Sequence, residues 1–280
     1  MALNALYVDF NSYFTSVEQQ LRPELRGKPV GVLAVMAETT CCIAASYEAK
    51  AFGIKTGTMV RDARKLCKDM VFVEARPPLY VEYHHKLIEI VESCTHVEKV
   101  LSIDEMVCKL TGSQQVKENA LKLADKIKRE IDKQFPFIRS SIGIAPNTFL
   151  AKTASNMQKP DGCVVIEDSD IPNKLFTLNL RALNGIGSQM QARLARYGID
   201  TVEKLYAANR AQLRSAWAAL RVSAITINCA ALSLFTLKIP AAAWGIATCC
   251  RLNSARWKAP KRCYTAYCKK PPCVCAVTIY

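Results

Sequence analysis

Two acidic sites stand far apart in the chain, and each follows an apolar run with β-strand character. Asp9 comes after residues 6–8, and Asp104 and Glu105 come after residues 101–103. Carboxylate oxygens are the ligands that Mg²⁺ prefers, and two such ions can clamp the attacking and leaving oxygens of a phosphoryl transfer. Strands also end on solvated acids that have no catalytic role. The prediction therefore requires Asp9 to meet the Asp104–Glu105 pair in space.

The composition favours a polyanionic partner. The chain has 280 residues, half of them hydrophobic, with 38 Lys and Arg against 24 Asp and Glu and a formal net charge of +14. Such a basic balance points to nucleic acid first. The apolar stretches are too short or too charged to span a bilayer, no basic leader with a cleavage site is seen, and the 13 cysteines lack the rhythm of a disulfide framework. We therefore expect a cytoplasmic protein with no membrane partner.

The elements that must position these acids alternate between strands and helices as far as about residue 166, which is typical of an α/β or α+β core. From about residue 170 the pattern is helical. Strands are expected over residues 3–10, 29–35, 41–45, 70–74 and 137–144 and as two runs within 97–110, and helices over residues 11–22, 47–52, 59–67, 80–93, 114–133 and 149–157.

A glycine-containing turn follows in the helical part. Residues 183–188, with Gly185 and Gly187, precede an amphipathic helix over residues 190–197 and resemble a helix-hairpin-helix motif. A Gly-x-Gly turn lets backbone amides approach a phosphate, and the next helix N-terminus adds its dipole. The alternative is an ordinary tight turn.

Seven short motifs, in this order and spacing, resemble those of the Y-family DNA polymerases, the translesion enzymes of the DinB/UmuC type. They are residues 8–10 (VDF), 47–57 (YEAKAFGIKTG), 102–105 (SIDE), 141–145 (SIGIA), 150–155 (LAKTAS), 159–162 (KPDG) and 185–187 (GIG).

The resemblance implies an α+β fold with a polymerase arrangement of domains. A palm with a mixed or antiparallel sheet and helices would comprise residues 1–22 and 78–166. Small fingers would comprise residues 23–77, and a helical thumb with the helix-hairpin-helix would comprise residues 167–220. Residues 221–280 would form an irregular tail in place of the family's little-finger domain.

The resemblance also implies roles for single residues. Asp9, Asp104 and Glu105 would be catalytic and would hold two Mg²⁺ ions, with the carbonyl oxygen of Phe10 as a further ligand. Phe14 would be the steric gate that crowds a ribose 2′-hydroxyl, and its alternative role is core packing.

The other implied contacts are to the incoming nucleotide and to the DNA. Tyr47, Lys50 and Lys159 would contact the triphosphate, although a surface lysine is more often simply solvated. Lys50 stands where the family often has Arg, and a lysine offers a point charge rather than a bidentate fork. The small residues 44–46 would leave room over the templating base, and Gly185 and Gly187 would contact the DNA backbone.

The last sixty residues differ in composition from the rest. Residues 221–280 contain 9 Lys and Arg, no acid, and 7 of the 13 cysteines. Reverse translation in a shifted frame can turn the stretch from Trp244 to Ala255 into GHSHVLPPELR, which resembles the start of a little finger. We therefore expect a frameshifted or truncated gene product with a break near residues 217–222, and an uninterrupted frame at the locus would contradict this. The alternative is a zinc site, although its cysteines lack a Cys-x₂-Cys pair; they are Cys263, Cys268, Cys273 and Cys275.

The leading functional hypothesis is a template-directed, Mg²⁺-dependent translesion DNA polymerase of DNA repair and the SOS response, impaired by loss of the little finger. Its expected partners are primer–template DNA and deoxynucleoside triphosphates, with a sliding clamp or a UmuD-like subunit as further candidates. A non-catalytic damaged-DNA-binding accessory protein on the same fold is the alternative. A helix-hairpin-helix repair module, such as a glycosylase or nuclease, would leave Asp9 and the Asp104–Glu105 pair without a role.

Overall fold

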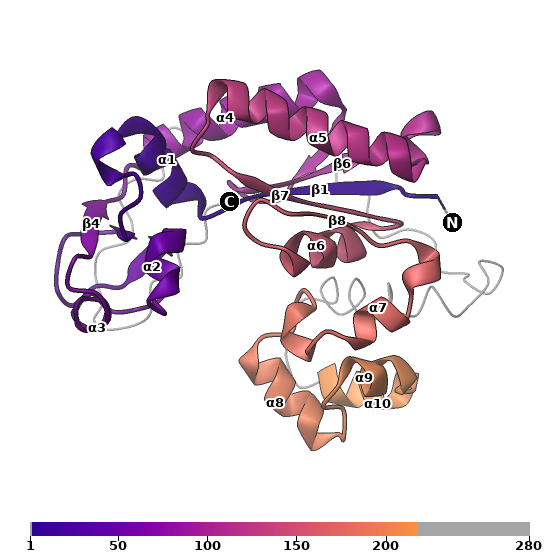
Figure 1. Ribbon diagram of the computed structural model, residues 1–280. Helices are drawn as coiled ribbons and strands as arrows, with labels where there is room; N and C mark the ends of the chain where they lie inside the picture. The colour runs from indigo at the N-terminus through magenta and orange to yellow at the C-terminus, as the bar shows by residue number, and fades with distance from the viewer. Residues whose placement is uncertain (1, 218–280) are drawn as a thin grey trace, which may run out of the picture.

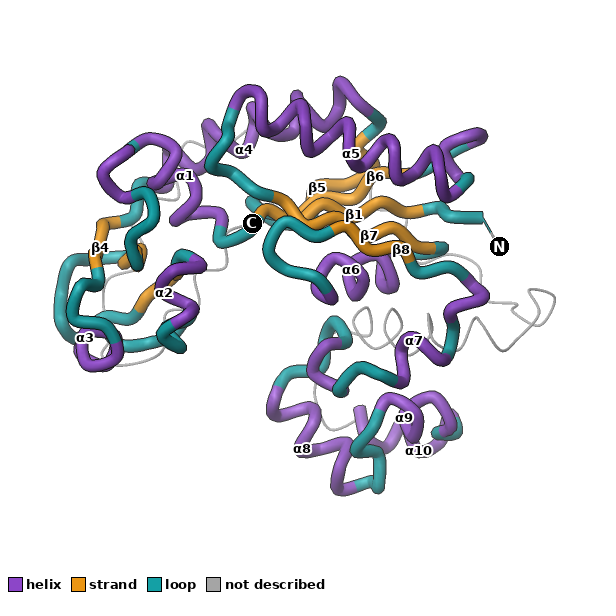
Figure 2. The backbone as a smooth tube through the Cα atoms, viewed as in Figure 1, coloured by secondary structure: helices purple, strands orange, loops and turns teal. Residues whose placement is uncertain are grey.

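The centre of the molecule is a five-stranded sheet, seen in a computed structural model that describes residues 2–217 (Figure 2). Its strand order is β5-β6-β1-β7-β8. All neighbours are antiparallel except β7 and β8, which run parallel. Every residue of the central strand β1 is buried, as expected for its continuous apolar run. The strands are β1 (Ala5–Phe10), β5 (Val97–Val100), β6 (Glu105–Lys109), β7 (Ser140–Ala145) and β8 (Cys163–Val165).

Helices cover both faces of this sheet (Figure 1). On one face lie α4 (Pro77–Cys94) and α5 (Lys117–Gln134), and on the other lies α6 (Thr148–Met157). The apolar residues of α5 recur at helical spacing and are buried on one side: Ala120, Leu123, Ala124, Ile127 and Ile131.

The contact between α6 and the sheet depends on one glycine. A Cβ atom added to Gly143 of β7 would lie 1.9 Å from the carbonyl oxygen of Ala151 and 2.4 Å from the amide nitrogen of Ser155. The missing side chain therefore lets the backbone of α6 rest directly on the strand. This close approach brings Lys152, the residue after Ala151, next to the sheet.

A smaller three-stranded sheet lies beside the first, in the order β3-β2-β4. β2 is antiparallel to β3 and parallel to β4. Its strands and the surrounding helices are α1 (Tyr13–Leu21), the 3-10 turn η1 (Pro23–Leu25), β2 (Val30–Leu33), β3 (Cys42–Ala45), α2 (Tyr47–Ala51), α3 (Val60–Leu66) and β4 (Val71–Glu74).

A buried carboxylate joins the two ends of this smaller unit. Glu18 in α1 is fully buried and accepts hydrogen bonds from Arg76 Nε at 3.0 Å and from the Tyr80 hydroxyl at 2.9 Å. Arg22, at the end of α1, lies 3.5 Å from the same carboxylate. The chain therefore leaves for the three-stranded sheet at Arg22 and returns from it at Arg76 beside one negative charge.

The remaining described residues are short helices that lie beneath α6 in Figure 1. Leu175, Leu180 and Leu194 are buried in one apolar cluster with Leu150 and Ala154 of α6. The elements are 3-10 turns η3 (Asp168–Asp170) and η4 (Leu180–Ala182) and helices α7 (Asn173–Phe176), α8 (Ser188–Arg196), α9 (Val202–Ala207) and α10 (Arg210–Trp217); another 3-10 turn, η2 (Gly112–Gln115), precedes α5.

The predicted α+β class and the mixed, largely antiparallel sheet are confirmed. The helix expected from residue 11 begins at Tyr13, because Ser12 has a left-handed backbone (φ 48). The helix expected from residue 80 begins earlier, with Pro77 in its first turn, where proline's missing N–H is harmless. The three-residue strand β8 was not expected.

Several sequence-based expectations concern the end of the chain. The irregular tail, the proposed frame break near residues 217–222 and the zinc alternative lie almost wholly outside the described residues, which end at residue 217. Within those residues, no helix is both long and apolar enough to cross a membrane. The six cysteines of that part of the chain are free thiols.

Candidate active site

The three predicted acids meet where β1 ends and β6 begins. Asp9 is paired with Glu105 in the antiparallel register of these two strands. The backbone N–H of Phe10 donates a hydrogen bond to the Asp104 carbonyl at 2.9 Å. Strand pairing thus brings together carboxylates that are almost a hundred positions apart in the chain.

Asp104 stands in a turn that is held from several sides. The N–H groups of Leu101 and Ser102 donate to the Glu105 carbonyl at 2.9 and 3.2 Å. His84 Nδ1, on α4, lies 2.8 Å from the Ile103 carbonyl, which can only accept, so this nitrogen carries the proton. The Ser102 hydroxyl donates to Asp104 at 2.6 Å. Asp104 is therefore placed by the turn before β6 rather than by the strand itself.

Two lysines supply positive charge to the acids. Lys159 Nζ lies 2.6 Å from Asp9 Oδ2, and Lys152 Nζ lies 2.9 Å from Glu105 Oε2. Lys152 comes from α6, which rests on the sheet, whereas Lys159 comes from the loop between α6 and β8. The cluster therefore holds three carboxylates and two ammonium groups.

Burial dominates the electrostatics of the acids. It raises the pKa of Asp9 to about 6 even though Lys159 opposes the shift, and the charges of Glu105 and Asp104 raise it further. Burial also raises the pKa of Asp104, against the Ser102 hydrogen bond and with the help of Glu105. Negative charge gathered away from water in this way favours the approach of a cation.

A hollow of about 300 Å³ opens beside the acids. Its wall includes all of the predicted acid, gate and triphosphate residues, and the small residues Ala44 and Ala45. Ser46 is not among its lining residues and instead caps α2, accepting from the Ala49 N–H at 3.3 Å. The hollow is lined by Asp9, Phe10, Asn11, Ser12, Tyr13, Phe14, Ile43, Ala44, Ala45, Tyr47, Lys50, Thr56, Asp104, Glu105 and Lys159.

Phe14 lies between the apolar core and the hollow. Its ring stacks on Tyr80 with centroids 4.5 Å apart and planes at 21°, and it packs against the main apolar core. It also lines the hollow. Core packing on one side therefore fixes a ring that faces the cavity on the other.

Lys50 forms a second basic point in the same hollow. Its Nζ lies 2.6 Å from the Ser12 hydroxyl oxygen and 4.2 Å from the centre of the Tyr47 ring. Partial loss of water lowers the pKa of Lys50, as does the positive charge of Lys159, while Asp9 opposes the shift. Two mutually repelling ammonium groups in one hollow suit an anionic ligand.

Some contributors to the site were not identified from the sequence. Asn11 is 2% exposed; its side-chain amide donates a hydrogen bond to the Asp9 carbonyl, and its Oδ1 accepts one from the Asp161 N–H. The other contributors contact the acids or the turn before β6; they are Ser102, His84 and Lys152. Lys152 was part of a noted motif, but only the packing of α6 on β7 shows that it reaches Glu105.

Gly185 and Gly187 lie apart from this hollow. Gly185 has φ +86, a conformation that favours glycine, and Gly187 is the N-cap of α8. A Cβ atom at Gly187 would meet nothing within 4 Å, so the turn is open. The segment before it is the short turn η4, so α8 is the regular helix of this motif.

The donor set fits a hard divalent ion, because Asp9, Asp104 and Glu105 offer only oxygen atoms. Within residues 2–217, no group of three or more His, Cys, Asp or Glu side chains is already arranged around a metal position. Lys159 and Lys152 engage two of the three acids.

The sequence profile of the impB/mucB/samB family matches residues 8–156, more than half of the chain. The chain belongs to this family. The match spans β1 through α6 and so includes both acidic sites. Family membership confirms the resemblance to DinB-type Y-family polymerases that the sequence motifs carried.

Relatives and solved structures agree with this assignment. The chain is 42% identical over 202 residues to the DNA polymerase IV of Moorella thermoacetica, covering 71% of this chain and 50% of that protein. It is 38% identical to that of Xanthomonas campestris, covering 71% and 55%. The chain thus spans about half the length of the curated relatives it matches.

Two solved structures share the fold. DinB from Sulfolobus solfataricus superimposes with a TM-score of 0.71 at 30% identity, covering 84% of this chain and 66% of that one. A Y-family polymerase chimera of Dbh and Dpo4 gives a TM-score of 0.73 at 29% identity, with the same coverage.

Proposed function

We propose that this chain carries the nucleotidyl-transfer site of a template-directed translesion DNA polymerase. The observation that supports this most is the single hollow shared by the three acids, Phe14, Tyr47, Lys50 and Lys159. Relatives named DNA polymerase IV and a solved ternary complex of the Dbh DNA polymerase support the same reading. The partners we propose are primer–template DNA and deoxynucleoside triphosphates.

The domain assignment is part of this proposal. Residues 1–22 and 78–166, with the five-stranded sheet, would be the palm. Residues 23–77, with the three-stranded sheet, would be the fingers. Residues 167–220 would be the thumb, in which Gly185 and Gly187 present backbone amides to a DNA phosphate.

Asp9, Asp104 and Glu105 would hold the metal ions, which we propose to be two Mg²⁺, with the Phe10 carbonyl as a further ligand. Bound ions of this kind neutralise the charge that develops on a transferring phosphoryl group. Lys152 keeps Glu105 oriented toward the cluster through its 2.9 Å contact.

The lysines of the hollow would bind the triphosphate. Lys50 and Lys159 both line it, and triphosphate oxygens would compete with Asp9 for Lys159. Because each is a point charge, phosphate binding depends on how firmly its position is held. Tyr47, which lies under the Lys50 ammonium, would add a hydroxyl contact.

Phe14 would select the sugar. Its ring is fixed against Tyr80, so it cannot easily give way to a ribose 2′-hydroxyl. Ala44 and Ala45 have only methyl side chains, and this leaves space for a distorted templating base.

Primer extension tests the function. We expect Asp104→Ala to abolish nucleotide incorporation, because one of three ligands is lost, while the far-UV circular dichroism stays that of the wild type. Asp62→Ala is the matched control, since Asp62 lies on α3 and pairs with the surface residue Lys65.

DNA binding measured alongside separates the alternatives. Binding that falls steeply with salt, with incorporation lost only in Asp104→Ala, supports the polymerase. Binding without incorporation by any form, the wild type included, favours the accessory protein. Unchanged extension by Asp104→Ala contradicts the role of the acids.

A further inference from the structure

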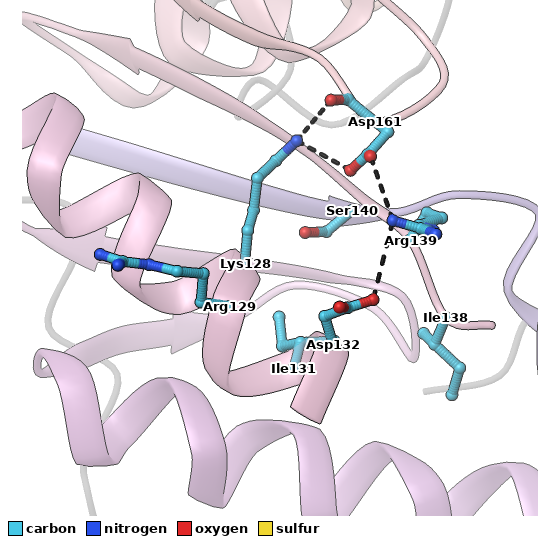
Figure 3. A pocket seen from close by; sticks show the side chains of 8 residues that line it. All are labelled: Lys128, Arg129, Ile131, Asp132, Ile138, Arg139, Ser140 and Asp161. Atoms are coloured by element: carbon cyan, nitrogen blue, oxygen red, sulfur yellow. Dashed lines mark hydrogen bonds and ion pairs between the residues drawn. The ribbon is translucent and has the colours of Figure 1, made fainter. Parts of the chain in front are cut away.

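A second hollow, of about 170 Å³, lies between α5 and the start of β7 and contains none of the candidate site residues (Figure 3). Lys128 reaches from α5 across this hollow toward Asp161, and Arg139 lies between Asp161 and Asp132.

Two cationic side chains that line the hollow form ion pairs with Asp161. Lys128 Nζ donates to Asp161 Oδ1 at 2.8 Å and also to the Asp161 backbone carbonyl. Arg139 lies 3.5 Å from Asp161 Oδ2 and 3.7 Å from Asp132. The Lys128 side chain is only 21% exposed, so it is packed along its length rather than extended into water.

Asp161 is also tied to the acid cluster on its other side. Its backbone N–H donates to Asn11 Oδ1 at 2.8 Å, and the Asn11 amide lies 3.4 Å from the Asp9 carbonyl. Asp161 has a left-handed backbone (φ 58), which a residue with a side chain adopts only with support from its surroundings. The hydrogen bonds from Lys128 and the ion pair with Arg139 provide such support.

Lys159 stands two residues before Asp161 in a tightly closed loop. A Cβ atom added to Gly162 would lie 2.0 Å from the Gln158 carbonyl, so the two ends of this loop touch. A shift of Asp161 therefore moves Lys159, whose Nζ lies 2.6 Å from Asp9.

We propose that Lys128 and Arg139 are positioning residues for Lys159. By holding Asp161 from outside the catalytic hollow, they keep the Lys159 ammonium where it contacts Asp9 and would receive the triphosphate. Affinity for the incoming nucleotide then depends on ion pairs that the nucleotide never touches. This inference rests on the proposed function for its consequence, but the position of Lys159 can be measured without any activity.

The first experiment measures the reactivity of Lys159 toward an acetylating reagent by mass spectrometry on the full chain. We expect Lys128→Met to raise its modification rate about fivefold, because Lys159 loses its fixed place beside Asp9. Arg129→Met is the matched control: Arg129 lines the same hollow but pairs with Asp125 at 2.8 Å. Lys128→Arg, which keeps the positive charge, should leave the acetylation rate of Lys159 as slow as in the wild type. An equal rate in wild type and Lys128→Met overturns the proposal.

The second experiment measures single-nucleotide incorporation. We expect Lys128→Met to raise the KM for the nucleotide about fivefold with kcat within about twofold, whereas Arg129→Met changes neither. Asp161→Asn should have the same effect, and combining it with Lys128→Met should add little. It also stands in for Lys128→Met if that variant does not fold. Additive effects of the two changes contradict the proposal. If the wild type itself incorporates nothing, the proposed function fails, and the acetylation rates alone decide the positioning role.

Discussion

Asp9 and Glu105 lie directly opposite each other in the β1–β6 ladder, so two acidic side chains face each other at the end of this strand pair. Opposed like charges destabilise a pair of strands. Lys159 and Lys152 offset part of this repulsion, at 2.6 and 2.9 Å. The site is therefore built at the expense of the stability of the sheet that carries it.

Neutralising Asp9 should stabilise the metal-free protein. Because the pKa of Asp9 is raised to about 6, the folded state binds its proton more tightly than the unfolded state does, and stability falls as pH rises from about 4 to about 6. We expect Asp9→Asn to raise the free energy of unfolding by about 1–3 kcal/mol above pH 6.5. Urea unfolding in EDTA measures this.

The pH dependence provides the check on Asp9→Asn. Below about pH 4 the wild-type carboxyl is already protonated, so the gain should vanish there. A gain of the same size at pH 4 and pH 7 would assign the effect to packing rather than to charge.

Shortening Phe14 should loosen sugar selection. We expect Phe14→Val to raise the ratio of ribonucleotide to deoxynucleotide incorporation by roughly tenfold or more, because a wall of the hollow is removed. Loss of the Tyr80 stack should also lower stability by about 1 kcal/mol. Ile43→Val, which trims another lining residue, should leave the ratio unchanged. An unaltered ratio in Phe14→Val would leave Phe14 with core packing alone.

Removing the buried carboxylate of Glu18 should be severe. We expect Glu18→Ala to lower the free energy of unfolding by about 2–3 kcal/mol, since it leaves the buried Tyr80 hydroxyl without its partner, while Arg76 is exposed enough to be solvated. Glu82→Ala removes an exposed helical pair with Lys86 and should change the stability far less than Glu18→Ala does. Thermal unfolding of both variants gives the comparison, and similar losses would show that burial of Glu18 is unimportant.

Two glycines should differ in how well they tolerate alanine. We expect Gly143→Ala to destabilise the fold by roughly 3 kcal/mol, because its methyl group would clash with the α6 backbone. Gly187→Ala meets nothing within 4 Å and has φ −83, so its stability should stay within about 0.5 kcal/mol of the wild type. The midpoint of urea unfolding measures both, and a tolerated Gly143→Ala would mean that α6 can move off β7.

The acid cluster could be predicted from the sequence because each acidic site follows an apolar run. The run before Asp9 becomes the buried strand β1 and ends beside the site, as expected. The run before Asp104 instead forms a turn after β5, and Glu105 starts β6 rather than ending a strand. The sequence could not give the register that sets Glu105 opposite Asp9, because β1 is buried on both faces and its continuous apolar run has no alternation to select one register. It also could not show that Asp104 stands in a turn held by His84.

Other features leave little trace in the sequence. β8 has only three residues and pairs with β7 after an intervening helix, so no local alternation marks it. Lys128 lies on a charged helix face, and its spacing does not distinguish it from Arg129. In the structure, the contact with Asp161 and the lower exposure of Lys128 separate the two.

Arg22 and Arg76 both contact Glu18, so the segment between them starts and finishes at one carboxylate. The three-stranded unit is thus an insertion whose two ends are held together by Glu18. We expect this shared contact to let the segment be exchanged while the acids on β1 and β6 keep their places. Exchanges of residues 23–75 should therefore succeed only when the recipient chain keeps Glu18, Arg22 and Arg76.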